Sequence, residues 1–299
     1  MKYIYTIFII VNICNVYLIK RVFMIAFSVF WYDIYRYWIF YLITFLFWYF
    51  FLRFVGKKKY FKNYPWVQKL LTTWLDDFFL ICMLGVILGW RLGHVFLYER
   101  WYFQDHLGQI LNFRQWGMSF VGWVIGVTLW LIYITWKFNL RRKELFLLGD
   151  LVLCIVPLWI LLGRIGNYLN QELIWRPLDD FSKSTQEFFI QRWLTTTYEN
   201  VDSLRRVNTN FIQASAEGLL LLLINWTIFL TTTIKNKAFP WLISGVFLIG
   251  YGIVRYLVEP VKDLPTTEML GYLSVSQWLM IGFIFVWCSI LFIWFKQKK

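Results

Sequence analysis

The residues best suited to chemistry lie in the run GRIGNYLNQE, from Gly163 to Glu172. This run places Arg164, Asn167 and Glu172 at the end of a segment that is apolar enough to cross a membrane. Charged side chains are costly in hydrocarbon, so their presence there indicates a functional site. Arginine is suited to binding a phosphate, because it stays charged, offers a planar fork of donors and is less strongly hydrated than lysine.

Other apolar segments contribute polar residues at a similar depth. Tyr251, Arg255 and Glu259 are spaced four residues apart, so they share one face of a helix. Arg91 and Tyr37 lie toward the outer ends of two further predicted spans. The excess of arginine over acid in this layer predicts an anionic ligand. The alternative is that the arginines form structural ion pairs with the nearby glutamates.

The composition predicts the elements that must hold these residues. Hydrophobic residues are 60% of the chain and charged ones 16%, against about 45–50% and 25% in an average soluble domain. Aromatic residues make up 22%, which is typical of side chains anchored at membrane–water interfaces. We therefore expect an all-α polytopic membrane protein. Seven segments approach or exceed the roughly 20 residues of a spanning helix, at about 29–52, 76–98, 117–136, 146–170, 216–233, 240–259 and 274–295.

The charges in the connections predict an orientation. The connections after the first, third and fifth spans are rich in lysine and arginine, as is the C-terminus, which places them in the cytoplasm. The candidate site then lies toward the outer face. We expect an external cap at 171–215, between membrane parts at 26–170 (spans 1–4) and 216–299 (spans 5–7 with a basic cytoplasmic tail). Residues 1–25 form an apolar extension that is either an interfacial helix or precedes a true start at Met24.

Several classes of function are disfavoured. The net charge of +13 lies mostly in short loops, which favours an anionic membrane surface over nucleic acid as the partner. The four cysteines have no paired spacing and only two histidines are present, so we expect neither a disulfide framework nor a metal or other cofactor. No internal repeat is evident, although a transporter with this polar layer as its substrate site remains an alternative.

The run GRIGNYLNQELIWRP, from Gly163 to Pro177, resembles the signature of prolipoprotein diacylglyceryl transferases. Three other motifs follow the order of that family, and Tyr37 and Tyr41 match tyrosines of its first span. These motifs are RLGHV at Arg91–Val95, GMSF at Gly117–Phe120, and FLIGYG at Phe247–Gly252 followed by Arg255 and Glu259. The resemblance covers roughly residues 26–295.

This resemblance implies a fold and an activity. Members have seven spans and transfer the diacylglyceryl group of phosphatidylglycerol to the lipobox cysteine of a preprolipoprotein, releasing glycerol phosphate. The reaction takes place at the outer face of the bacterial inner membrane and is the first step of lipoprotein maturation.

The resemblance also implies roles for individual residues. Arg164 and Arg255 match critical arginines of the family and are expected to bind the phosphate, with Arg91 as a further substrate-binding residue. The polar side chains that match groups thought to orient the lipid or tune the arginines are Asn167, Glu172 and Glu259. Tyr37 matches a tyrosine that the family requires.

The chain also departs from the family pattern. Val121 stands where the family has a histidine often proposed as a base, and residues 207–213 replace its His-Pro-x-Gln-Leu-Tyr-Glu motif. Trp175 replaces a glycine and Tyr35 a histidine. A thiol has a pKa of about 8.5 and gives some thiolate near neutrality, so we expect activity without these histidines, with Glu172 or Tyr37 accepting the proton. The alternative is a non-catalytic descendant that binds lipid or lipoprotein.

Overall fold

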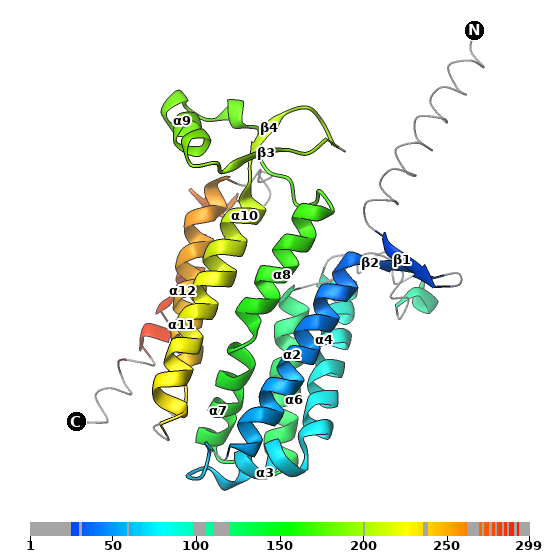
Figure 1. Cartoon of the computed structure of the whole chain (residues 1–299), viewed down its shortest axis with the longest axis vertical. Helices are drawn as coiled ribbons and strands as arrows, with labels where there is room; N and C mark the ends of the chain where they lie inside the picture. The colour runs from blue at the N-terminus through cyan, green and yellow to red at the C-terminus, as the bar shows by residue number, and fades with distance from the viewer. Residues whose placement is uncertain are drawn as a thin grey trace. The chain divides into compact units, whose positions relative to one another are not determined.

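The computed structural model is mostly helical (Figure 1). It describes residues 25–29, 32–58, 60–97, 106–110, 120–199, 201–235, 239–261, 269–270, 272–274, 277–278, 280–282, 284–285, 287–289 and 292. The predicted extension at 1–25 lies almost wholly outside these residues.

Five helices among the described residues are long and apolar enough to cross a membrane. They are Ile39–Lys57, Leu75–Phe96, Arg142–Leu169, Thr209–Thr233 and Leu242–Val261. Two shorter apolar helices, Ile125–Lys137 and Met280–Ser289, fall in the third and seventh predicted spans. The prediction of an all-α polytopic membrane protein is therefore confirmed, whereas the number of seven spans stays a prediction.

The chain divides into two compact units. Unit 1 contains Met1–Phe47, Leu153–Thr227 and Ile243–Lys299, and unit 2 contains Trp48–Val152 and Ile228–Leu242. The helix α2 (Arg36–Lys57) contributes its first part to unit 1 and its second part to unit 2.

Unit 2 is built around a close pair of helices. The pair is α4 (Leu75–Leu97) and α6 (Phe120–Lys137). Besides the second part of α2, the unit also contains α3 (Pro65–Thr73), η1 (Leu107–Gln109), α7 (Arg142–Leu153) and the π-helical η4 (Phe229–Thr233). Glycines let α4 and α6 touch along their backbones. A Cβ on Gly126 would lie 2.3 Å from the Gly85 carbonyl oxygen, and one on Gly122 would lie 2.3 Å from that of Gly89. Small residues permit such approaches between membrane helices.

Unit 1 holds three adjacent helical segments and an outer segment (Figure 1). The helices are α8 (Val156–Leu169), the continuous run of α10 (Thr209–Gln213), η3 (Ala214–Leu220) and α11 (Leu221–Ile228), and α12 (Leu242–Val258), which η5 (Glu259–Val261) extends. The outer segment comprises η2 (Leu178–Asp180), α9 (Lys183–Gln191) and the antiparallel strands β3 (Thr195–Thr197) and β4 (Arg205–Val207). Leu178, Phe189 and Val207 form its small apolar core.

The predicted start of the first span at residue 29 is wrong. Residues there form an antiparallel hairpin of β1 (Ile25–Val29) and β2 (Tyr32–Tyr35), in which Ser28 pairs with Asp33, and α2 begins at Arg36. The hairpin is rich in β-branched and aromatic residues, which favour strands. Apolarity alone does not distinguish such residues from the start of a spanning helix.

The predicted fourth span is interrupted. A turn at Cys154 and Ile155 separates α7 from α8, just before Pro157. Proline has no N–H to donate to the carbonyl four residues earlier, which here belongs to Leu153. Asn225 Nδ2 donates to that oxygen at 2.8 Å, and Trp226 Nε1 donates to the Cys154 oxygen at 3.1 Å. The Asn225 side chain of α11 thus replaces the missing helical hydrogen bond, as an apolar surrounding requires. The short strands β5 (Met269–Leu270) and β6 (Leu273–Ser274) of unit 1 pair with each other in antiparallel orientation.

Candidate functional site

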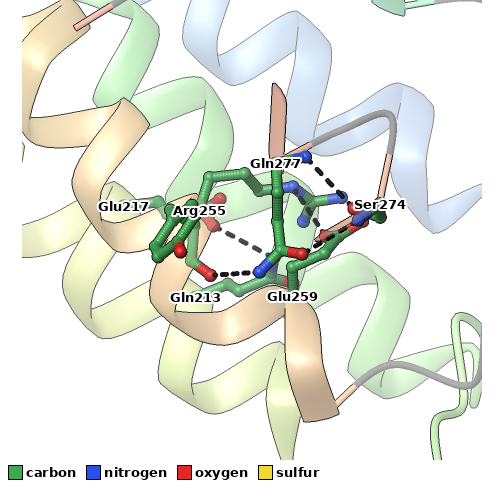
Figure 2. Close-up of polar contacts among 7 residues, drawn as sticks. Gln213, Glu217, Arg255, Glu259, Ser274 and Gln277 are labelled. Atoms are coloured by element: carbon green, nitrogen blue, oxygen red, sulfur yellow. Dashed lines mark hydrogen bonds and ion pairs between the residues drawn. The ribbon is translucent and has the colours of Figure 1, made fainter. Parts of the chain in front are cut away.

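A cluster of charged side chains, with two buried glutamates and two half-buried arginines, lies where α8, η3 and α12 meet in unit 1. Glu217 on η3 interacts electrostatically with Arg164 on α8 and Arg255 on α12. Arg255 Nε lies 3.6 Å from Oε2 of Glu259, one helical turn further along (Figure 2). Glu217 and Glu259 have exposed fractions of 0% and 1%. Buried charges are stable only when they are paired, and these four groups form two cations and two anions.

Glu217 is held by a neighbour on its own helix. Gln213 Nε2 donates to Glu217 Oε1 at 3.0 Å, and both side chains are fully buried (Figure 2). The other carboxylate oxygen, Oε2, has no hydrogen-bond partner among the described residues. Residues 214–220 are π-helical, a local widening that is frequent at functional sites.

A second group of side chains fixes Glu259. Ser274 Oγ donates to Glu259 Oε1 at 3.5 Å and accepts from the Gln277 N–H at 3.1 Å. Gln277 Oε1 in turn accepts from the Ser274 N–H at 3.0 Å (Figure 2). This reciprocal pair of hydrogen bonds keeps Ser274 beside the carboxylate, so Glu259 is supported from a segment 15 residues further along the chain.

Trp175 lies beside Arg255 and is tied by a hydrogen bond to the outer segment of unit 1. The guanidinium carbon of Arg255 lies 6.0 Å from the ring centroid of Trp175, which is 5% exposed. Arg206 Nη1 on β4 donates to the Trp175 carbonyl oxygen, and Arg206 also forms an ion pair with Asp202. Arg206 thereby ties the backbone of Trp175 to the β3–β4 hairpin.

Glu172 and Tyr41 lie on another side of Arg164. The Tyr41 hydroxyl group interacts electrostatically with both Glu172 and Arg164, and its ring packs edge-on against Trp159 at 5.6 Å. The Glu172 carbonyl oxygen accepts from Asn210 Nδ2 at 3.0 Å. Positive φ values at Gln171 (54°) and Leu173 (53°) turn the backbone sharply on both sides of Glu172, so the end of α8 folds back toward α10.

Comparison with known proteins shows the family of the chain. A family model described as "Prolipoprotein diacylglyceryl transferase" matches residues 24–294. The chain belongs to this family. Relatives named phosphatidylglycerol–prolipoprotein diacylglyceryl transferase include one from Aromatoleum aromaticum, 35% identical over 222 residues, which are 73% of this chain and 76% of the relative. One from Azoarcus sp. is 34% identical over 221 residues (73% and 76%), and one from Cupriavidus metallidurans is 31% identical over 230 residues (75% and 76%).

Membership of the prolipoprotein diacylglyceryl transferase family confirms the resemblance seen in the sequence and makes the chain a membrane transferase of lipoprotein biosynthesis. The structure brings four of the predicted site residues into one region of unit 1: Arg164, Glu172, Arg255 and Glu259. Asn167 lies in the last turn of α8, where its carbonyl oxygen accepts from the Glu172 N–H at 2.9 Å.

Arg91 and Tyr37 complete the set of predicted site residues. Arg91 belongs to unit 2, where its Nε donates to the Ile110 carbonyl oxygen and its Nη2 to that of Gln109, both at 2.8 Å. Tyr37 is the second residue of α2, and its side chain lies outside the described part of the structure. Their predicted roles stay predictions.

Sequence reasoning missed the neutral members of the cluster. Gln213, Ser274 and Gln277 are buried beside the two glutamates, but they carry no charge, and neutral amides and hydroxyls are common in apolar segments. Asn210 was noted only as a departure from the family pattern. The available signal was the spacing of Gln213 and Glu217, four residues apart in an apolar segment.

Proposed function

We propose that this chain transfers the diacylglyceryl group of phosphatidylglycerol to the lipobox cysteine of a prolipoprotein, with release of glycerol phosphate. The observation that carries the proposal is the cluster of Arg164, Glu217, Arg255 and Glu259, with both glutamates buried, in a member of this family. The relatives are named for the same donor and acceptor.

Arg255 is equipped to bind the phosphate of the donor. Its Nε faces Glu259, whereas Nη1 has no hydrogen-bond partner among the residues that the structure describes. That buried donor is available to a phosphate oxygen, and Arg164 adds a second positive charge nearby. In the reaction a bond forms between the cysteine sulfur and a glyceryl carbon, while the bond from that carbon to a phosphate oxygen breaks. The electron pair leaves with the phosphate, and the arginines stabilise the charge that grows there.

The thiol proton needs an acceptor in the absence of the family histidines. Glu172 and Tyr37 are candidates from the sequence. Glu217 is a third, since its Oε2 is buried without a partner among the described residues. A carboxylate held between two arginines can accept a proton from a thiol whose own pKa the arginines lower.

Topology forms the second part of the proposal. The five long helices, with α6 and the helix Met280–Ser289, would make seven spans. The segment 171–215 would form a cap on the outer side, between membrane parts 26–170 and 216–299, with the C-terminus in the cytoplasm. The basic connections at 53–62, 137–143 and the chain end support this orientation. Labelling of a cysteine placed at Ser184 from the cytoplasmic side would contradict it.

A transfer assay on the purified chain tests the activity. Phosphatidylglycerol and a lipobox peptide are supplied, and peptide mass and glycerol phosphate are followed, with Arg255→Ala as a control. Diacylglyceryl peptide from the natural chain alone is the expected result. Phosphatidylglycerol binding without release of glycerol phosphate would instead indicate a non-catalytic lipid-binding protein.

A further inference from the structure

A row of aromatic rings and lysines crosses one end of unit 2. Along the row, which we call the aromatic–lysine row, lie Trp66, Lys69, Trp74, Phe138, Lys137 and Tyr133. It joins α3, the residue before α4, and the last turns of α6 with the residue that follows them. None of these residues belongs to the cluster around Glu217.

Contacts within the row are continuous. The Lys69 ammonium lies 5.4 Å from the ring centroid of Trp66 and 4.6 Å from that of Trp74. Trp74 stacks on Phe138 with centroids 4.5 Å apart. Lys137 lies 5.5 Å from the Phe138 centroid and 5.9 Å from that of Tyr133. Attraction to the ring faces restrains both ammonium groups at the surface.

The helix α3 presents this row outward and keeps its apolar side against the protein. Val67, Leu70 and Leu71 are buried, while Trp66 is 39% exposed and Lys69 is exposed. Gln68 fastens the helix, because its Nε2 donates to the Gly56 oxygen at 2.6 Å and its Oε1 accepts from the Phe61 N–H at 3.3 Å. These hydrogen bonds hold α3 in place, with Trp66 and Lys69 on its exposed side.

The charged residues around the row are mostly basic. Residues 53–77 and 137–144 contain ten basic and three acidic residues. Two of the three acids are already engaged, since Asp76 accepts from the Tyr49 hydroxyl at 2.7 Å and the buried Glu144 pairs with Arg141. Trp66 is exposed and Trp74 is half-buried. Indoles beside lysines are typical of the headgroup level of a membrane, where rings lie among the lipids and lysines reach the phosphates.

We propose that the aromatic–lysine row binds the headgroups of anionic phospholipids at the cytoplasmic surface of the membrane, an orientation that rests on the proposed function. Lys69 and Lys137 contact lipid phosphates, and Trp66, Trp74 and Tyr133 lie at the level of the glycerol groups. A soluble polyanion is a poorer fit, because it offers nothing to the exposed aromatic surface.

Thermal unfolding of the purified chain in neutral detergent tests the proposal. Phosphatidylserine is added as the probe, because it is anionic and is not the proposed donor, and phosphatidylcholine is added in parallel. We expect phosphatidylserine to raise the Tm by a few degrees, since a ligand that binds only the folded state stabilises it, and phosphatidylcholine to raise it much less. The rise should shrink as salt increases.

Paired variants locate the effect. In Lys69→Gln/Lys137→Gln the rise in Tm should fall to half or less, whereas Lys69→Arg/Lys137→Arg should keep it. Lys183→Gln removes an exposed lysine of α9 and should also keep it. A full rise in the double glutamine variant, or an equal rise with soluble heparin, would overturn the proposal. Transfer activity of that variant is measured alongside, so a failure of the lipid site is distinguished from a failure of the transferase.

Discussion

Gln213 donates its side-chain amide to Oε1 of Glu217 across 3.0 Å, inside the helix that carries both residues. Removing that amide leaves a buried carboxylate oxygen without its donor, which costs about 1–3 kcal/mol. We expect Gln213→Leu to lower kcat/KM for transfer about tenfold or more, because Glu217 loses its fixed position between the arginines. Gln186→Leu on α9 removes an amide of the same size outside the cluster and should leave transfer unchanged. Equal activity of both variants would show that Gln213 does not position Glu217.

Arginine geometry at position 255 is expected to matter as much as its charge. Arg255 uses Nε toward Glu259 and has Nη1 available to a ligand, and the compact ammonium of a lysine cannot reproduce this planar fork of separated donors. Arg255→Lys should therefore reduce kcat/KM at least tenfold, measured by release of glycerol phosphate. The matched control is Arg176→Lys, at a half-buried arginine that is paired with Asp180 outside the cluster. Retained transfer in Arg255→Lys would contradict the assigned role.

The charged residues of the site could be predicted from the sequence, but the neutral residues that form hydrogen bonds around them could not. Arg164, Arg255 and Glu259 stand out because charges in apolar segments are rare. Ser274 and Gln277 come from another segment, and only the folded chain shows that they meet Glu259. The separation of these residues along the sequence does not predict that contact.

The fold could likewise be predicted only in part from the sequence. Hydropathy located the long helices, but it could not show that residues 25–35 form a hairpin. A break could have been predicted at Pro157, which lies inside the predicted span 146–170. The side chains that hydrogen-bond the carbonyl groups at this break lie 72 residues away on α11, and the sequence does not identify them. The local preferences of the residues therefore predicted which helices form, while tertiary packing determined where the elements end and which other elements they contact.

The outer segment of unit 1 should lose stability in acid. Arg206 hydrogen-bonds the Asp202 carboxylate, which holds the pKa of Asp202 below its usual value. A depressed folded-state pKa stabilises the segment above the unfolded value of about 3.9, and this contribution is lost as the pH falls through the folded pKa. Proteolytic cleavage in the β3–β4 loop should thus increase below about pH 4. Asp202→Asn should show faster cleavage at neutral pH and a smaller dependence on pH. An unchanged pH profile in that variant would refute the link.

The hydrogen bond from Asn225 to the Leu153 carbonyl is expected to stabilise the interrupted helix. Asn225→Leu leaves that oxygen unpaired in an apolar surrounding, which should lower the free energy of unfolding by about 1–3 kcal/mol. Pro157→Ala supplies the missing N–H, so Asn225→Leu should cost less in that background. A double-mutant cycle measured by thermal unfolding checks this coupling. Strictly additive effects would mean that Asn225 does not compensate for the proline.

The approach of α4 to α6 leaves no room for a side chain at Gly126. A Cβ there would lie 2.3 Å from the Gly85 carbonyl oxygen and 2.9 Å from the Gly89 Cα, both of which are backbone atoms that cannot move aside alone. Gly126→Ala should therefore push the helices apart and lower the Tm, with a cost of about 1–3 kcal/mol from overpacking. Gly163→Ala is the matched control for stability, because a Cβ there meets nothing within 4 Å, and alanine is the better helix former by roughly 1 kcal/mol. A Tm that falls equally in both variants would show that the cost comes from losing glycine and not from the contact.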